Sequence, residues 1–348
     1  QVEHLRVAAI GAGGMASGHF RNLSDFEDVE LVAICDISEA QAIRQCKKYG
    51  GKPYTNYEMM LDKEHIDAVY ICIPPFAHGE PELAVCQRQI PLFIEKPLST
   101  QMKVAQKIYQ AIQEYNIITS IGYHWRYQHN INLAKSLLSE QKIVGALGYW
   151  MSGFPGTPWW SIRERSGGQH VEQTTHVFDL CRYLVNSDVV SVHGFSAQDS
   201  TKVIKNHNVD DMSIINIRFA NEVIVNITSA CMLKKWSRVR LELFCDGLVV
   251  EIEPSLELSF IDTSSTDEGT KGGNLRINRS GQIEEHIHYM SGYVTEDRVF
   301  IDAVKTGNTS QIRSTYADSL KTLELTLAAS LSFETGKVVN LKEPGILD

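Results

Sequence analysis

The feature that most constrains this chain is a regular alternation of short apolar segments and helical segments up to residue 122. The apolar segments are hydrophobic along their whole length, which is typical of parallel strands covered by helices on both faces. We therefore expect an α/β fold that begins with a doubly wound parallel sheet. The expected strands are 7–11, 30–36, 67–75, 91–97 and 118–123, and the expected helices lie near 14–23, 38–49, 78–89 and 100–115.

Beyond residue 122 the pattern changes to paired strands joined by short turns. Residues 212–233 and 238–254 predict hairpins that turn at Ala-Asn and Asp-Gly. A chain of 348 residues is also long enough for two domains. We expect a Rossmann dinucleotide-binding domain over 1–122 and an α+β domain on a mainly antiparallel sheet over 123–348. In the second domain, helices are expected near 171–185, 293–306 and 315–335, and a polar loop at 263–274.

Composition excludes several classes of function. The net charge is −9 and no Lys/Arg-rich block occurs, so a nucleic-acid partner is not expected. The seven scattered cysteines form no CxxC pair, which favours free thiols in a reducing cytoplasm over disulfides or a zinc site. The apolar runs fall short of the ~18 residues of a membrane span, and the first strand begins too early for a signal peptide. We expect a soluble, cytoplasmic protein with no metal site.

The junction between the first strand and first helix carries a glycine-rich turn. Residues 11–16, Gly-Ala-Gly-Gly-Met-Ala, fit the pattern GxGxx(G/A). Gly11 would permit the tight turn, Gly13 would let the backbone approach a pyrophosphate, and Ala16 would allow close helix–sheet packing. The free N–H groups at the helix N-terminus would bind the phosphates. A plain glycine turn remains the alternative.

Asp36 ends the second strand, where its carboxylate can accept hydrogen bonds from both ribose hydroxyls of an adenosine. A 2′-phosphate about 5 Å from this carboxylate would cost roughly 3 kcal/mol at an effective dielectric of ~20. NAD is therefore favoured over NADP as the cofactor. A helix N-cap at Asp36 is compatible with both interpretations.

Two unusual sequences follow later strands, at the edge of the sheet where ligands bind in open parallel folds. Ile73-Pro74-Pro75-Phe76-Ala77-His78 follows one strand, and Glu95-Lys96-Pro97 ends the next. Lys96 at the end of a buried strand is unusual for a surface lysine, although an ion pair with Glu95 would also explain it. For His78, the start of the next helix is the simpler interpretation.

Taken in order, GAGGMA, Asp36, IPPFAH, EKP and then GYHWRY (122–127) resemble the Gfo/Idh/MocA oxidoreductases, and the likeness extends to the C-terminal helices. The resemblance implies a Rossmann domain followed by an α/β domain with a large open sheet that often forms the oligomer contact. A homodimer or homotetramer through that sheet is therefore expected. The implied cofactor-binding residues are Gly11, Gly13, Gly14, Met15, Asp36, Ile73, Pro74, His78, Glu95 and Lys96.

The same family carries a helix of the form GGxxxDxGxHxxD in its second domain, whose Asp and His reach into the active site. Gly167 and Gly168 match its glycines, and His176 and Asp179 match its His and last Asp. Two positions depart from the pattern, since Glu172 replaces the first Asp and Thr174 replaces a Gly. Both departures affect which substrate is expected. The change to Glu172 also affects the expected role of the carboxylate.

The residues themselves support this helix in part. Val177, Leu180, Cys181 and Leu184 form one apolar helical stripe, while Glu172, His176 and Asp179 lie on a different face. Three other interpretations stay open. A metal site has only two adjacent ligands, a surface Glu–His pair would contribute a few tenths of a kcal/mol, and a core histidine with satisfied hydrogen bonds is the strongest alternative.

The resemblance implies an NAD-dependent dehydrogenase for a secondary alcohol on a sugar, cyclitol or related polyol. His176 would take the hydroxyl proton, Lys96 would stabilise developing alkoxide charge, and Glu172 would position the hydroxyl or His176. Alternatives are a catalytically silent nucleotide-bound sensor or regulator and NAD-assisted glycoside cleavage. Candidate walls of the substrate pocket are Tyr123, Arg126, Trp159, Trp160 and Trp236. For each tryptophan, core packing is an equal explanation.

Overall fold

A computed structural model describes residues 4–198, 207–256, 272–288 and 292–347. The chain divides into two compact units, each discontinuous in sequence. The first unit contains Gln1–Tyr123 and Tyr293–Leu320, and the second contains His124–Gly292 and Lys321–Asp348. The first division falls within one residue of the expected boundary. The second domain is not the continuous stretch 123–348 that the sequence suggested, because residues 293–320 pack with the first unit.

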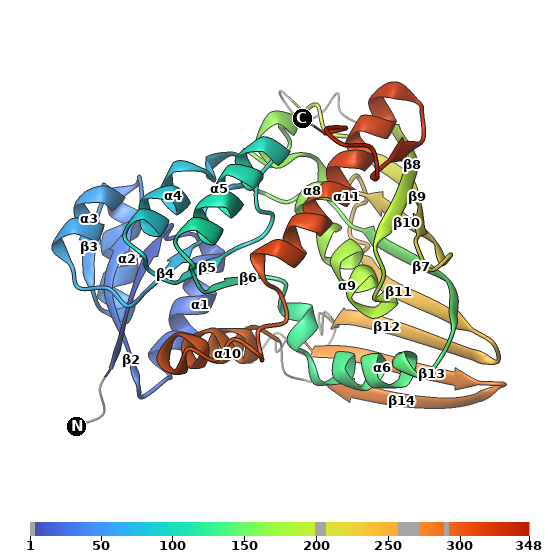
Figure 1. Ribbon diagram of the computed structural model, residues 1–348, viewed down its shortest axis with the longest axis horizontal. Helices are drawn as coiled ribbons and strands as arrows, with labels where there is room; N and C mark the ends of the chain where they lie inside the picture. The colour runs from blue at the N-terminus through green and yellow to red at the C-terminus, as the bar shows by residue number, and fades with distance from the viewer. Residues whose placement is uncertain (1–3, 199–206, 257–271, 289–291, 348) are drawn as a thin grey trace. The chain divides into compact units, whose positions relative to one another are not determined.

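The first unit is built on a six-stranded parallel sheet with the order β3-β2-β1-β4-β5-β6 (Figure 1). The strand order reverses between β1 and β4, which is where ligands bind in doubly wound folds. This sheet confirms the expected Rossmann architecture. Its strands are β1 (Leu5–Ile10), β2 (Val29–Cys35), β3 (Lys52–Tyr54), β4 (Ala68–Ile71), β5 (Leu92–Ile94) and β6 (Thr119–Ile121).

Helices connect these strands as the sequence predicted, with one additional pair of elements. The short strand β3 and the helix α3 (Tyr57–Lys63) were not predicted, because three residues of strand and seven of helix carry too little periodicity. The other helices are α1 (Gly14–Ser24), α2 (Glu39–Tyr49), α4 (Glu80–Gln87), α5 (Met102–Glu114) and the 3₁₀ turn η1 (Pro75–Ala77).

The helix α10 (Gly292–Thr306) explains why the late segment belongs to the first unit. Phe300 and Ile301 are fully buried in the same core as Phe20 of α1 and Phe93 of β5. On the surface of the unit, Arg298 and Lys305 of α10 both bind Asp28, at 2.8 and 2.6 Å. The apolar contacts therefore fix α10 to this sheet, and the ion pairs add to them.

The second unit is built on a nine-stranded sheet with the order β14-β13-β12-β11-β7-β10-β9-β8-β15. Every pairing is antiparallel except that between β7 and β10, and both predicted hairpins are present. The mainly antiparallel open sheet is thus confirmed. Its strands are β7 (Ile143–Met151), β8 (Val189–Ala197), β9 (Met212–Phe219), β10 (Ile224–Ala230), β11 (Arg238–Cys245), β12 (Leu248–Leu256), β13 (Gly272–Arg279), β14 (Gln282–His288) and β15 (Val339–Asn340).

Helices of the second unit pack against one face of this sheet and form its core (Figure 1). The opposite face, which we call the outer sheet face, exposes Leu147, Phe195, Ile214 and Ile224 from four neighbouring strands. The predicted loop 263–274 lies outside the described residues up to 271, and β13 begins at Gly272. The helices are α6 (His129–Ser139), α7 (Arg163–Ser166), α8 (Gln169–Glu172), α9 (Thr175–Val185) and α11 (Tyr316–Thr335, shared with the first unit), with the 3₁₀ turn η2 (His124–Tyr127).

None of the helices in the described part of the chain is both long and apolar enough to cross a membrane.

Candidate functional site

The glycine turn lies between β1 and α1, as predicted. Gly11 has φ of 101°, and a Cβ there would come within 2.1 Å of the Cys72 carbonyl oxygen, so only glycine fits. A Cβ at Gly13 or Gly14 would meet nothing within 4 Å. The turn therefore packs tightly against the end of β4 at Gly11 and leaves open space at the start of α1, where N–H groups are free to bind phosphate.

The Asp36 carboxylate is fixed beside this turn. One oxygen accepts a hydrogen bond from the Ala12 N–H and the other from the Ser38 N–H, each at 2.8 Å. The N-cap of α2 is Ser38, so the expected N-cap at Asp36 is wrong, and the second contact holds the backbone of Ser38 just before the helix. The first ties the end of β2 to the glycine turn, which places a carboxylate next to the proposed pyrophosphate site. Met15, the other residue predicted here, is 45% exposed at the start of α1.

His78 follows the 3₁₀ turn at Pro75–Ala77 and lies two residues before the first residue of α4, whose N-cap is Gly79, so it does not itself start that helix. Its buried ring places Nδ1 2.5 Å from Glu82 Oε1, and Glu82 Oε2 accepts a hydrogen bond from the Gly79 N–H at 2.7 Å. Among the described residues Nε2 has no hydrogen-bond partner. A cofactor contact through Nε2 stays a prediction.

Lys96 follows β5, and the carboxylate of its neighbour Glu95 is buried. Glu95 Oε2 accepts a hydrogen bond from the Lys96 backbone N–H at 3.1 Å, and Oε1 lies 3.0 Å from His19 Nε2. Glu95 is therefore occupied by the backbone of Lys96 and by a buried imidazole, which leaves its predicted cofactor contact without structural support.

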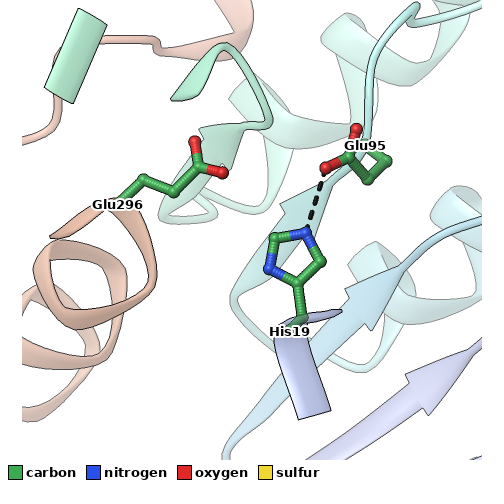
Figure 2. A group of neighbouring side chains, drawn as sticks. All are labelled: His19, Glu95 and Glu296. Atoms are coloured by element: carbon green, nitrogen blue, oxygen red, sulfur yellow. Dashed lines mark hydrogen bonds and ion pairs between the residues drawn. The ribbon is translucent and has the colours of Figure 1, made fainter. Parts of the chain in front are cut away.

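Sequence reasoning missed the buried cluster to which Glu95 belongs. His19 of α1, Glu95 and Glu296 of α10 bring one ligand atom each within 4.8 Å of one another, close enough to suggest a metal site (Figure 2). The second ring nitrogen of His19, Nδ1, lies 2.7 Å from Asp297 Oδ1. The signal in the sequence was a histidine on the buried face of α1, next to Phe20, where an apolar residue is expected.

The side chains of this cluster pair with one another. Burial lowers the pKa of His19, but Asp297 and Glu95 outweigh it and raise that pKa well above its ordinary value. Burial raises the pKa of Glu296 well above its ordinary value. Both ring nitrogens of His19 are thus paired with carboxylates, and burial favours the neutral acid form of Glu296.

In the second unit the expected helix at 171–185 is broken. α8 ends at Glu172 and α9 begins at Thr175, because the Thr174 N–H bonds to the Gln169 carbonyl instead of continuing the regular ladder. Glu172 and His176 therefore belong to two short helices rather than to one face of a single helix. The apolar stripe Val177, Leu180, Cys181 and Leu184 is buried as predicted.

The local backbone conformation explains the two glycines that precede these helices. Gly167 and Gly168 have φ of 80° and 92°, and a Cβ on Gly167 would come within 2.7 Å of Val171. Both positions need glycine for the backbone path alone. The glycine pair therefore carries no information about catalysis.

Glu172 and His176 occupy different surroundings. Glu172 Oε2 accepts a hydrogen bond from the Trp160 indole N–H at 2.6 Å. The His176 ring is 6% exposed and lies among aromatic rings, with centroids 4.8 Å from Trp125 and 5.0 Å from His124. This burial fits an aromatic-walled base, and it fits the core-histidine alternative equally well.

Arg126, predicted to line the substrate pocket, has a structural partner. Its Nε and Nη2 donate to the two oxygens of Asp179 at 2.7 and 2.6 Å, and both residues are buried. The Thr322 hydroxyl also donates to Asp179, at 2.9 Å. This bidentate pair ties η2 to α9 and α11, so Arg126 stabilises the second unit, and its predicted substrate role has no support here.

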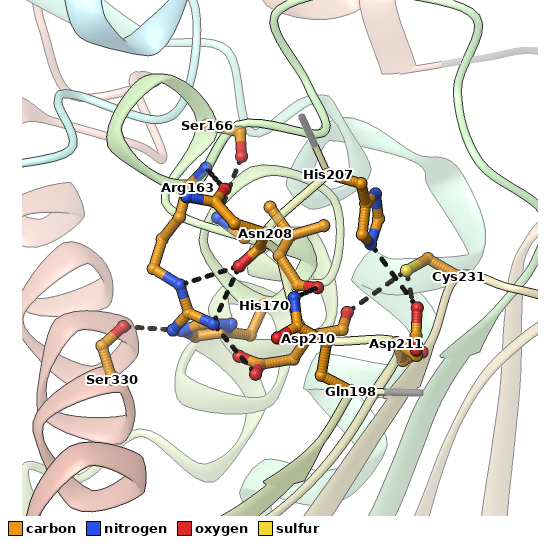
Figure 3. A network of polar contacts seen from close by, with 12 residues as sticks. Arg163, Ser166, His170, Gln198, His207, Asn208, Asp210, Asp211, Cys231 and Ser330 are labelled. Atoms are coloured by element: carbon orange, nitrogen blue, oxygen red, sulfur yellow. Dashed lines mark hydrogen bonds and ion pairs between the residues drawn. The ribbon is translucent and has the colours of Figure 1, made fainter. Parts of the chain in front are cut away.

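The segment around α7 and α8 is held by a polar network (Figure 3). Arg163 binds Asp210 at 2.9 Å and donates to the Asn208 carbonyl. His170 Nε2 lies 2.7 Å from the Ser330 hydroxyl of α11, and burial lowers the pKa of His170 to about 3. The network fixes α8, and with it the backbone that carries Glu172.

The remaining predicted pocket residues differ in exposure. Tyr123, in the first unit, is 1% exposed; in the second unit, Trp160 is also 1% exposed, and it packs with Val209 and Cys231. Trp159 is half-buried and Trp236 is 50% exposed. Trp160 is thus a core residue that also positions Glu172, and substrate contact by the others stays a prediction.

The two units match two family models. Residues 5–123 match an oxidoreductase family with an NAD-binding Rossmann fold, and residues 129–250 match the GFO/IDH/MocA C-terminal domain. The first unit is therefore the NAD-binding domain of an oxidoreductase. The chain belongs to the Gfo/Idh/MocA family, as the order of its motifs indicated.

Curated relatives and solved structures extend along nearly the whole chain. Myo-inositol 2-dehydrogenase from Thermotoga maritima is 24% identical over 97% of this chain and 99% of the relative. NAD-dependent scyllo-inositol 2-dehydrogenase from Bacillus subtilis is 25% identical over 98% of this chain and 97% of the relative. The crystal structure of myo-inositol 2-dehydrogenase from Lactobacillus plantarum superposes with a TM-score of 0.81 at 24% identity, covering 97% and 99% of the two chains.

Proposed function

We propose that this protein transfers a hydride between a secondary alcohol of a sugar, cyclitol or related polyol and the nicotinamide of NAD. The observation that carries the proposal lies within the first unit. The glycine turn follows β1 and Lys96 follows β5, with only β4 between these two strands. A cationic side chain and a dinucleotide turn thus share the ligand-binding edge of one sheet.

The residues of the turn fit NAD. The open space at Gly13 and Gly14 admits a pyrophosphate beside the N-terminus of α1, and the Asp36 carboxylate is fixed where it can accept from ribose hydroxyls. When bound, NAD supplies the hydride acceptor. The same carboxylate repels a 2′-phosphate by roughly 3 kcal/mol at about 5 Å and an effective dielectric of ~20, which favours NAD over NADP.

The proposed chemistry divides among three side chains. Lys96 donates a hydrogen bond to the reacting oxygen and stabilises its negative charge as the C–H bond breaks. A ring nitrogen of His176 accepts the hydroxyl proton, so that the alcohol becomes a carbonyl. Glu172, held by Trp160, orients the hydroxyl or the imidazole. In the reverse direction His176 returns the proton to the carbonyl oxygen.

The substrate class is supported by the relatives. Two full-length relatives, at 24% and 25% identity, are inositol dehydrogenases, which makes cyclitols the first compounds to test. A screen of NAD reduction at 340 nm across inositols, aldoses and sugar acids tests the proposal. Turnover of one class with NAD, lost in Lys96→Ala, supports it, whereas NAD binding without turnover of any polyol contradicts it.

A nucleotide-bound sensor without turnover is the second candidate, favoured by the burial of His176 among aromatic rings. NAD-assisted glycoside cleavage is a third outcome of the same screen. It would release sugar without net formation of NADH, since the hydride returns to the product.

We also propose that the outer sheet face binds a second copy of the chain. Leu147, Phe195, Ile214 and Ile224 expose apolar side chains there, between 41% and 64% exposed, on neighbouring strands. Contiguous apolar patches of this kind mark association surfaces. Light scattering should give a dimer or tetramer, and Leu147→Asp with Ile224→Asp should give a monomer.

A further inference from the structure

A buried histidine links three elements of the NAD-binding unit. His19 is 1% exposed on α1, and its two ring nitrogens lie 3.0 Å from Glu95 Oε1 and 2.7 Å from Asp297 Oδ1. Glu95 follows β5, and Asp297 belongs to α10. The rings of Tyr70 and Phe93 pack against the imidazole at centroid distances of 5.4 and 4.8 Å.

The other groups that face His19 either have pKa values that favour their neutral forms or hold its carboxylate partner in place. Burial raises the pKa of Cys72 to about 12 and raises the pKa values of Tyr70 and Glu296 well above their ordinary ranges. The Tyr293 ring lies 6.0 Å away, and the Asn22 amide donates to Asp297 Oδ2 at 2.8 Å. Each ring nitrogen of His19 faces one carboxylate, that of Glu95 or of Asp297, and this pairing compensates the cost of burying these polar groups.

The Glu95 carboxylate is clamped from three sides. His19 holds Oε1, and the Lys96 N–H donates to Oε2 at 3.1 Å. Gly122, at the end of β6, closes the third side, since a Cβ there would lie 2.6 Å from Oε1 and 2.8 Å from Oε2. Both carboxylate oxygens are thus held by a hydrogen bond or ion pair, and one of these contacts is with the backbone of the residue that follows Glu95.

We propose that His19 is a positioning residue for Lys96: anchored on Asp297, its ring fixes the Glu95 carboxylate, which in turn fixes the backbone from which the Lys96 side chain extends. The inference deepens the proposed function and rests on the role assigned there to Lys96. An error of about 1 Å in the place of a reacting group can cost 10²-fold in rate, so a rigid strand end matters for the lysine.

Three variants disturb the chain of contacts at different points. His19→Gln removes the imidazole ring, and Glu95→Gln removes the negative charge at constant shape. Gly122→Ala changes no charge and pushes the carboxylate away, because the contacted atoms are the flexible end of Glu95. The matched controls are Glu296→Gln, which leaves both carboxylate contacts of His19 in place, and Gly18→Ala, which adds a methyl group to α1 with nothing within 4 Å.

The first measurement needs no substrate. In protein labelled with ¹⁵N-lysine, the Lys96 amide resonance, assigned with Lys96→Arg, reports the hydrogen bond to Glu95. We expect the Lys96 amide resonance to shift in His19→Gln, Glu95→Gln and Gly122→Ala. It should keep its wild-type position in the two control variants. An unmoved Lys96 amide in a folded His19→Gln protein would overturn the inference. A shift of the Lys96 amide resonance in Glu296→Gln, or zinc bound to the purified protein, would overturn the pairing of His19 with Glu95 and Asp297 alone.

The second measurement links the contact to turnover. With NAD and the best polyol from the screen, kcat should fall at least 10-fold in His19→Gln and Gly122→Ala, while the Kd of NAD from calorimetry changes less than 3-fold. Equal losses in kcat and NAD affinity would mean that His19 only holds the domain together. If Lys96→Ala keeps full activity, the proposed function fails, and the amide shifts still decide whether His19 positions residue 96.

Discussion

Trp160 donates its indole N–H to the Glu172 carboxylate over 2.6 Å, and the ring of Trp160 is 1% exposed while Glu172 is half-buried. A core side chain thus holds a carboxylate at the end of α8. Charge-assisted hydrogen bonds of this kind contribute about 1.5–3 kcal/mol. The contact therefore restricts Glu172 to one orientation.

Trp160→Phe should keep most of the apolar packing and release Glu172. We expect kcat/KM to fall several-fold, with a loss of about 1–3 kcal/mol in the free energy of unfolding. Kinetics and denaturant titration of Trp160→Phe, Glu172→Gln and the double variant test the coupling. If the effects of the two single changes on kcat/KM simply add, the contact has no part in catalysis.

His176→Ala should lower the rate of the chemical step by roughly 10²–10⁴-fold while the affinity for NAD changes little, because the cofactor is bound by the other unit. Single-turnover kinetics and calorimetry measure the two quantities. The core-histidine alternative makes the opposite prediction: the melting temperature drops and the folded molecules turn over normally.

Lys96→Ala should lower kcat/KM strongly while the protein stays folded, because the ammonium is proposed to contact the reacting oxygen. Lys96→Arg should not restore activity, since a planar guanidinium cannot replace a compact ammonium. Circular dichroism checks folding. A fully active Arg variant would mean that position 96 needs only a positive charge.

The free energy of unfolding should depend on pH because His170 titrates at different pH values in the folded and unfolded chain. Its folded pKa of about 3 lies below the unfolded value of about 6.5, because burial opposes its charging. The unfolded chain then takes up the proton first, so stability is full above pH 6.5 and falls as the pH drops toward 3, by at most about 1.4 kcal/mol per pH unit.

His170→Gln keeps a polar partner for Ser330 and removes this titration. Urea unfolding at pH 7.5, 6.0 and 5.0 should show a smaller loss of stability on acidification in the variant than in the wild type. Equal losses would assign the acid sensitivity to other groups.

The turn chemistry of the Rossmann unit could be predicted because each feature is local. Gly11 needs positive φ, the apolar strands run continuously, and Asp36 directly follows β2, so neighbouring residues define the structure. The same holds for the hairpin that turns at Asp246-Gly247.

Partners far apart in sequence could not be predicted in this way. His19 meets Asp297 across 278 positions, and Arg126 meets Asp179 across 53. Periodicity marks His19 as a polar residue on a buried face, but no local rule names its partner. The contact between the hydroxyls of Thr174, at the break before α9, and Ser229 is a further pairing that no local rule names.

The return of α10 to the first unit has a consequence for biosynthesis. Phe300, Ile301 and Asp297 complete the core and the ion pairs of a unit that begins at the N-terminus. A nascent chain that has exposed only residues 1–123 lacks them, and His19 then has one carboxylate partner instead of two. On the ribosome the NAD-binding unit therefore cannot reach its final state until α10 has been synthesised, and the segment His124–Gly292 of the other unit is translated before that helix.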